Sequence, residues 1–256
     1  MKGLIKLKIA EGLEMLEIST VLMNGPGVIH PSLIWDKDEA VLIDAGITYQ
    51  TQQFREAIER AGVQFERLSK IIITHADADH IGCLSGILKE ATQKITVFAH
   101  EKEKPYIEAE VLPLRLEQMD AQAAALQGEL GQQMKKLCDG LRANYKMLKA
   151  NVDVTVDDGQ VLPYCGGITV IYTPGHTFGH ICLYHQKSKT LITGDQFNVE
   201  NGELIYAPAF TLFDKDKYKE SVKKLTRYDI KTVICYHGGV YRDNANERIA
   251  VLAGEM

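Results

Sequence analysis

Apolar residues in this chain recur mostly in the short runs typical of β-strands. Several runs alternate with polar residues, and Gly, Pro, Asn or Asp, which favour turns, bound most of them. The pattern predicts strands in the first half at residues 15–21, 32–35, 40–44, 71–74 and 95–99, and in the second half at residues 160–162, 168–172, 181–184, 190–193 and 232–235.

Helical spacing separates these strands. Residues 49–61 carry Phe54, Ile58 and Ala61 at intervals of three or four, and Gly62 marks the end of that helix. Further helices are expected at residues 81–90, 215–225 and 244–253. Because strands and helices alternate along both halves of the chain, the pattern predicts an α/β protein.

The stretch from residue 105 to residue 149 differs from its surroundings. It consists of long runs of Gln, Ala, Glu, Leu, Lys and Met without a strand pattern, which predicts two or three helices. No low-complexity tract or linker divides the chain. We therefore expect a single domain over residues 1–256 with a helical insertion at about 105–150.

Four side chains of the kinds that bind metal ions crowd into six positions directly after a predicted strand. The run 70–73 is apolar after its first residue, and it is followed by His75, Asp77, Asp79 and His80. A strand end that leads into a helix start is where open α/β sheets place their chemistry. Imidazole and carboxylate together suit a divalent metal of borderline hardness, such as zinc, iron or manganese.

Three further strand ends supply the same kinds of side chain next to small residues. His176 follows a Pro-Gly turn, Asp195 follows Gly194, and His237 precedes Gly238. Each signal is weak alone, but four strand ends of this type predict one shared metal site. Asp44, at a neighbouring strand end, is expected to hydrogen-bond a ligand and fix its tautomer.

Composition and charge exclude several partners. The formal net charge is −5, so the chain lacks the basic surface expected of a nucleic-acid or anionic-membrane binder. The five cysteines are odd in number and scattered, as expected in a reducing compartment. The N-terminus lacks the pattern of a secretory signal, and no apolar stretch approaches the roughly 20 residues of a membrane span. We expect a cytoplasmic protein that binds neither nucleic acid nor a membrane.

Together these motifs resemble the metallo-β-lactamase superfamily. The most specific parts are Thr-His-x-x-x-Asp-His-x-Gly at residues 74–82 and Thr-Pro-Gly-His-Thr-x-Gly-His at residues 173–180. The resemblance implies a four-layer αββα sandwich and two divalent metal ions. It assigns one ion to His75, Asp77 and His176 and the other to Asp79, His80 and His237, with Asp195 bridging the two; His180 is expected to support the site by hydrogen bonding rather than to bind metal.

Asp77 departs from the family's usual His-x-His-x-Asp-His cluster, because it stands where most members have histidine. An additional hard oxygen ligand favours iron or manganese relative to zinc. A non-ligating role for Asp77 as a helix N-cap is the alternative, and the site would then hold a single ion.

The resemblance implies a hydrolase that uses a metal-activated hydroxide, with Asp79 as ligand and catalytic residue. We expect a small-molecule substrate with an ester-like bond, namely a carboxylic ester, lactone or thioester. Phe178, Tyr206 and the helical insertion are expected to line its pocket, and the insertion makes a homodimer plausible. Three alternatives stay open: a phosphoester hydrolase, a di-iron redox protein or oxygenase, and a catalytically silent metal-binding protein.

Overall fold

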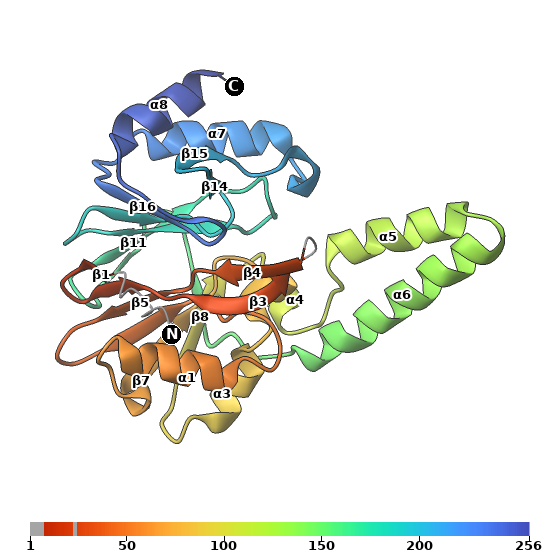
Figure 1. Cartoon of the computed structure of the whole chain (residues 1–256), viewed down its shortest axis with the longest axis horizontal. Coiled ribbons are helices and arrows are strands. Elements are labelled where there is room, and N and C mark those ends of the chain that lie inside the picture. Colours follow the sequence, from red (N-terminus) through yellow and green to blue (C-terminus); the bar gives the residue numbers. More distant parts are fainter. Residues whose placement is uncertain (1–7, 23–24, 256) are drawn as a thin grey trace.

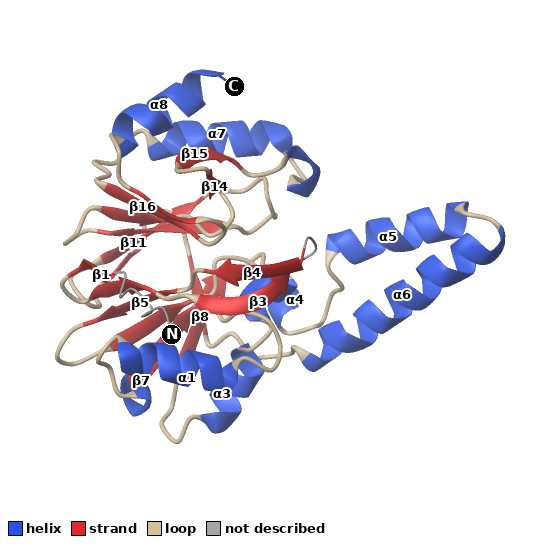
Figure 2. Cartoon of the chain, in the orientation of Figure 1, coloured by secondary structure: helices blue, strands red, loops and turns tan. Residues whose placement is uncertain are grey.

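The structure is a computed structural model that describes residues 8–22 and 25–255. Two β-sheets lie face to face, and helices cover the outer face of each sheet (Figure 1). Figure 2 shows the resulting order of layers, helix, sheet, sheet and helix. The αββα sandwich expected from the sequence is confirmed.

The first sheet has seven strands in the order β1-β2-β5-β6-β7-β8-β9. Strands β6, β7, β8 and β9 are parallel neighbours, and α1 (Thr51–Arg60) and α3 (Leu84–Glu90) connect the first three. The strand bounds are Lys8–Ala10, Leu13–Met15, Ser32–Trp35, Ala40–Ile43, Leu68–Ile72, Thr96–His100 and Val154–Val156, in the order of the sheet.

The second sheet has six strands in the order β10-β11-β12-β13-β16-β17. Strands β13 and β16 pair in parallel, and α7 (Lys215–Leu225) lies between them in the chain, with α8 (Ala245–Glu255) beside it. The strand bounds are Val161–Leu162, Ile168–Tyr172, Ile181–His185, Thr190–Ile192, Thr232–Cys235 and Gly239–Tyr241.

Successive side chains of a strand point to opposite faces of its sheet, so a strand inside the sandwich contributes to two different cores. In β6, Ala40 and Leu42 belong to the core beneath α1 and α3, whereas Val41 and Ile43 belong to the core between the two sheets. A strand buried on both faces must be apolar at every position, which is why β6 forms an uninterrupted apolar run.

The two long helices of the 105–150 region leave the body of the molecule as an arm (Figure 1). They are α5 (Leu114–Ala125) and α6 (Gly128–Met147), and the short α4 (Lys104–Ile107) precedes them. The arm has a small core of its own around Leu116, Ala123 and Cys138. The single-domain boundaries and the expected homodimer stay predictions.

Three predicted elements are wrong in their boundaries. The strand expected at 71–74 is β7, which begins three residues earlier and ends at Ile72. The strand expected at 15–21 is two strands, because β2 pairs with β5 in the first sheet whereas β3 (Ile18–Leu22) forms a separate hairpin with β4 (Gly25–Ile29). The helix expected at 81–90 is α2 (Ala78–Ile81) followed by α3. The helix breaks there because the amides of Gly82 and Cys83 donate to the carbonyl oxygens of Gly46 and Ala45.

Several short strands were not predicted from the sequence. They are β1, β4, β9, β17 and the hairpin of β14 (Phe197–Glu200) with β15 (Glu203–Tyr206). Each is short and partly exposed, so the local apolar pattern does not reveal it, and its pairing depends on the partner strand. Within the described residues, no helix is long and apolar enough to cross a membrane.

Candidate metal centre

The candidate ligands come from the ends of strands in both sheets. Asp44 follows β6 and His75 follows β7, and these strands are parallel, so their ends lie at the same edge of the first sheet. In the second sheet, Asp195 follows β13 and His237 follows β16, which are again parallel. Packing of the two sheets brings these edges together, and the turn after β11 adds His176.

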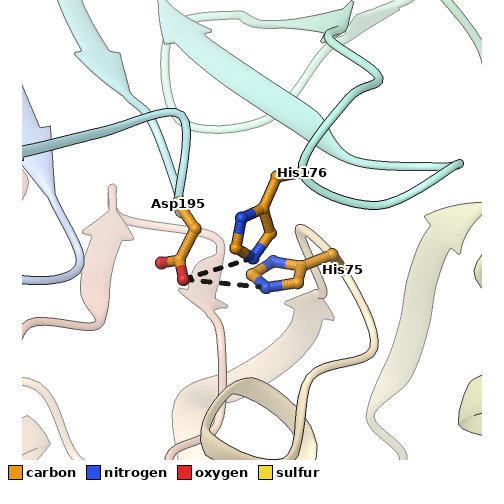
Figure 3. Close-up of side chains that lie close together, drawn as sticks. All are labelled: His75, His176 and Asp195. Carbon is orange, nitrogen blue, oxygen red and sulfur yellow. Dashed lines mark ion pairs between the residues drawn. The ribbon is translucent and has the colours of Figure 1, made fainter. Parts of the chain in front are cut away.

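One group of possible ligands consists of His75, His176 and Asp195, all buried (Figure 3). Oδ2 of Asp195 lies 3.5 Å from Nε2 of His176 and 4.0 Å from Nε2 of His75. Asp77 joins this group through its own Oδ2, which is 3.3 Å from Nε2 of His176 and 3.6 Å from Nε2 of His75.

The other group consists of Asp79, His80 and His237, whose ligand atoms all lie within 4.8 Å of one another. Oδ2 of Asp79 is 3.2 Å from Nε2 of His237 and 3.9 Å from Nε2 of His80. Asp195 faces this group too, with Oδ1 at 3.2 Å from Nε2 of His80 and Oδ2 at 3.5 Å from Nε2 of His237. The structure therefore brings all seven candidate metal-binding residues together.

Unpartnered polar atoms test whether these residues fit metal ions. Nε2 of His75, Nε2 of His80 and Oδ1 of Asp195 are buried and make no hydrogen bond, although neighbouring polar atoms lie close. Two atoms that each bind one tetrahedral ion at about 2.1 Å lie about 3.4 Å apart. The donor types, their spacing and their missing hydrogen bonds all fit divalent ions.

Hydrogen bonds behind the ligands fix which ring nitrogen faces the centre. Asp44 Oδ2 lies 2.9 Å from Nδ1 of His80, and Thr74 Oγ1 lies 3.1 Å from Nδ1 of His75. With Nδ1 engaged in this way, Nε2 of each ring is directed at the other ligands. Asp44 thus makes the expected hydrogen bond to a candidate ligand. Its backbone is in the left-handed region, with φ of 64°.

The carboxylates make the centre strongly anionic. Burial lowers the pKa of His237, but the carboxylates of Asp195 and Asp79 outweigh burial and raise that pKa to about 10. Burial likewise lowers the pKa of His80, but Asp195, Asp44 and Asp79 outweigh it and hold that pKa well above its ordinary value. So many buried carboxylates need positive charge nearby. Either protonated imidazoles or bound metal ions can provide that charge.

Glu103 is a site residue that the sequence did not reveal. Its buried carboxylate accepts from the amides of Ala76 and Gly179 and from the hydroxyl of Thr177. It therefore fastens the loop of His75 and Asp77 to the loop of His176. Glu103 lies in a stretch rich in Glu and Lys, so no local signal distinguishes it from a surface residue.

Tyr236 and Arg115 are two further residues that the sequence did not indicate. The hydroxyl of Tyr236 donates to the carbonyl oxygen of Asp79 at 2.6 Å, and its ring lies 3.9 Å from that of His80 between centroids. Arg115, from the first turn of α5, forms an ion pair with Asp77 at 2.9 Å. The residues next to Arg115 in the sequence do not suggest a metal centre. Its contact with Asp77 arises because the fold places the start of the arm beside the candidate ligands.

A pocket adjoins the first group of ligands. Asp77, Arg115, Phe178 and Phe213 are among its lining residues, so Phe178 lies where it was expected. The prediction for Tyr206 is wrong. Its hydroxyl donates to the carbonyl oxygen of Leu252, because the β14–β15 hairpin packs beneath α8.

The remaining histidines differ in their roles. His180 supports the site as expected, because its Nδ1 lies 2.9 Å from Thr173 Oγ1 and its Nε2 accepts from the amide of Asp195. His30 is half-buried, and its Nδ1 lies 3.2 Å from the carbonyl oxygen of Tyr236. His100, the last residue of β8, stacks on Tyr172 with ring centroids 4.4 Å apart.

Comparison with known proteins identifies the family. A sequence model of the metallo-beta-lactamase superfamily matches residues 24–237, and the chain belongs to this superfamily. Among curated proteins, the probable metallo-hydrolase YflN of Bacillus subtilis is 29% identical over 212 residues, which cover 77% of this chain and 75% of that protein. The probable metallo-hydrolase YybB of the same organism is 29% identical over 177 residues, covering 69% and 65%.

Solved structures share the fold. A metallo-beta-lactamase family protein from Thermus thermophilus superposes with a TM-score of 0.71 at 18% identity, over 97% of this chain and 80% of that chain. The superfamily protein ST1585 from Sulfolobus tokodaii superposes with a TM-score of 0.64 at 22% identity, over 95% and 85%. Identities this low establish a common fold and carry no information about substrate.

Proposed function

We propose that this protein is a metal-dependent hydrolase that cleaves an ester-like bond in a small molecule. The observation that carries the proposal is the convergence of two sets of ligand atoms, His75, His176 and Asp195 on one side and Asp79, His80 and His237 on the other. Membership of the superfamily and the metallo-hydrolase names of its relatives support the same reaction class.

Two divalent ions would be held by these side chains. In this proposal the first ion takes His75, Asp77 and His176, the second takes Asp79, His80 and His237, and Asp195 bridges them. Bound divalent ions acidify water to supply a nucleophile near neutral pH and polarise the oxygen of the bond that is cleaved. Zinc, iron and manganese all suit this mixed set of imidazole and carboxylate ligands.

The chain's own residues would orient the reactants. Asp79 is proposed as the catalytic residue, because its contacts with His80 and His237 both use Oδ2, which leaves its second oxygen to accept a hydrogen bond from water and orient it. Its pKa is favourable to this role: burial raises it, but His80 and His237 outweigh burial and lower it. Asp79 is thus ionised near pH 7 and able to act as a hydrogen-bond acceptor.

The pocket favours a carboxylic ester, lactone or thioester over a phosphoester. Its walls include the rings of Tyr106, Phe178 and Phe213. Among the described residues that line it, Arg115 carries the one positive charge, and Asp77 already pairs with that charge. A phosphoester brings up to two negative charges, which such a lining neutralises poorly.

A substrate panel tests the proposal. Purified protein, reconstituted with zinc or manganese, is expected to hydrolyse at least one member of a panel of esters, lactones and thioesters. Chelation should abolish turnover, and Asp79→Ala should lower kcat by about a hundredfold or more. His100→Gln changes a histidine outside the centre and should retain turnover.

Other results would contradict the proposal in distinguishable ways. Turnover limited to phosphodiesters would show that the proposed substrate class is wrong and would leave the metal-dependent mechanism in place. Oxygen consumption together with iron-dependent visible absorbance, and no hydrolysis, would indicate a redox protein. Bound metal without any turnover would indicate a catalytically silent member.

A further inference from the structure

Arg115 is a cation that reaches the first group of ligands from outside the two sheets. Its guanidinium donates to Oδ2 of Asp77 from Nη2 at 2.9 Å and from Nε at 3.2 Å. The same Nη2 lies 3.2 Å from Nε2 of His176 and donates to the carbonyl oxygen of Thr211 at 3.1 Å. One guanidinium edge therefore contacts two of the side chains assigned to the first ion.

The hydrogen-bonding capacities of these groups put Arg115 in competition with an ion. A guanidinium has only donors, so Nε2 of His176 can act only as the acceptor in its contact with Arg115. The same nitrogen lies 3.3 Å from Oδ2 of Asp77, where it would have to donate, so the contact with Arg115 selects the tautomer without a proton on Nε2. A neutral imidazole has one nitrogen lone pair, and the nitrogen that accepts a hydrogen bond cannot bind a metal ion at the same time. Oδ2 of Asp77 likewise accepts twice from Arg115, which uses both of its lone pairs.

Charge acts in the same direction. An arginine side chain stays protonated at all ordinary pH values, so a divalent ion beside it meets a fixed positive charge. The second group has no comparable neighbour: within the part of the chain that the structure describes, Asp79, His80 and His237 form ion pairs only with each other, Asp44 and Asp195.

We infer that Arg115 competes with the first metal ion for Asp77 and His176, so that the two ions bind unequally and the second site fills first. This inference rests on the two-ion centre of the proposed function. Filling of the first site requires the guanidinium to withdraw from His176. Its side chain is 31% exposed and lines the pocket, so it has a path away from the ligands.

The inference gives Asp77 a physical role in this chain. A histidine at position 77 would offer Arg115 no carboxylate, and the guanidinium would have no charged anchor beside the centre. Asp77 and Arg115 therefore act as a pair that lowers the affinity of the first site. Because Arg115 begins the arm, binding of the first ion is also linked to the position of α5.

Zinc titration of metal-free protein, by calorimetry with a competing chelator and by elemental analysis, tests this without measuring turnover. The wild type is expected to show two dissociation constants that differ by at least tenfold. Arg115→Gln removes the charge but keeps a polar side chain, and it should tighten the weaker site at least tenfold. Arg142→Gln is the matched control, because Arg142 pairs within the arm with Asp120 and Asp139.

Three other outcomes of the titrations overturn the inference. Two equal, tight zinc sites in the wild type would mean that Arg115 does not compete. Unchanged constants in Arg115→Gln would mean the same. Loss of both sites in Arg115→Gln, with the control intact, would show that Arg115 supports the whole centre instead. Absence of hydrolysis with unequal zinc sites would remove the proposed reaction and leave this inference standing.

Discussion

At the scale of single residues, the centre is governed by the balance between buried carboxylates and the cations that neutralise them. Asp77, Asp79 and Asp195 lie within a few ångströms of four imidazoles. Burial raises the pKa of Asp195, but His237 and His80 outweigh burial and hold that pKa well below its ordinary range. In the metal-free protein, protons on His80 and His237 supply the missing positive charge.

This balance predicts that metal binding releases protons. The pKa of His237 is about 10, so its imidazole is charged at pH 7, whereas a metal ion requires the neutral ring. Apparent zinc affinity should therefore rise with pH, about tenfold per unit for each proton displaced, until the pH passes the pKa of His237.

Calorimetry at pH 7 in two buffers that differ in ionisation enthalpy measures this release. Zinc binding to the second site should displace about one to two protons, from His237 and His80. His100→Gln, whose histidine stacks on Tyr172 outside the centre, should leave the number unchanged. An enthalpy that is the same in both buffers would contradict the prediction.

At the scale of elements, short turns after strands hold the candidate ligands at fixed positions. Gly238 directly follows His237 and has φ of +92°. A Cβ on Gly238 would lie 1.9 Å from the carbonyl oxygen of Val199 in β14. Val199 also donates its amide to the carbonyl oxygen of His237, so the hairpin packs directly on the ligand's backbone. Only glycine permits this approach.

Gly238→Ala is therefore expected to destabilise the fold and to displace His237. Gly202→Ala is the matched control, because Gly202 also has positive φ, +83°, but an added Cβ would meet nothing within 4 Å. Strain at φ alone costs about 1–2 kcal/mol, and the overpacking at Gly238 should add about 1–3 kcal/mol. Urea denaturation compares the two free energies of unfolding, and equal losses would mean that the close approach to β14 carries no cost.

At the scale of the whole molecule, the two sheets and the arm differ in how they are stabilised. The sheets share a continuous apolar core between them, which includes Ile43, Ile72, Ile181 and Ile234. Among the side chains that the structure describes, the arm buries Leu116, Ala123 and Cys138 in its own cluster, and it leaves apolar side chains exposed on α6 at Leu130, Leu137, Leu141 and Met147. Few buried contacts predict a low local stability.

Hydrogen exchange should reveal this difference. Amides of α5 and α6 are expected to exchange at least a hundredfold faster than those of β6 and β7, because local opening of the arm exposes little buried surface. Mass spectrometry of exchanged peptides measures the rates. Arm protection equal to that of the sheets would contradict the prediction, and protection that rises with protein concentration would support the expected homodimer.

The local pattern carried much of the fold and of the candidate site. Uninterrupted apolar runs revealed β6, β16 and the apolar end of β7, because these segments are buried on both faces. The ligand side chains follow strands of this kind, so His75 and His237 were visible as polar residues next to apolar runs. By contrast, β4 and β14 belong to short hairpins with few apolar residues in a row, and the partner strand decides their pairing, so the pattern did not reveal them.

The layered α/β class and the side chains at four strand ends can be predicted from the sequence, because periodicity and strand ends are local properties of the chain. The surroundings of those side chains depend on how distant parts of the chain pack together. Glu103 joins two ligand loops and Arg115 reaches Asp77 from the arm, at sequence separations of 27 and 38 residues from their partners. Contacts at such separations depend on how the elements pack, and no local pattern encodes them.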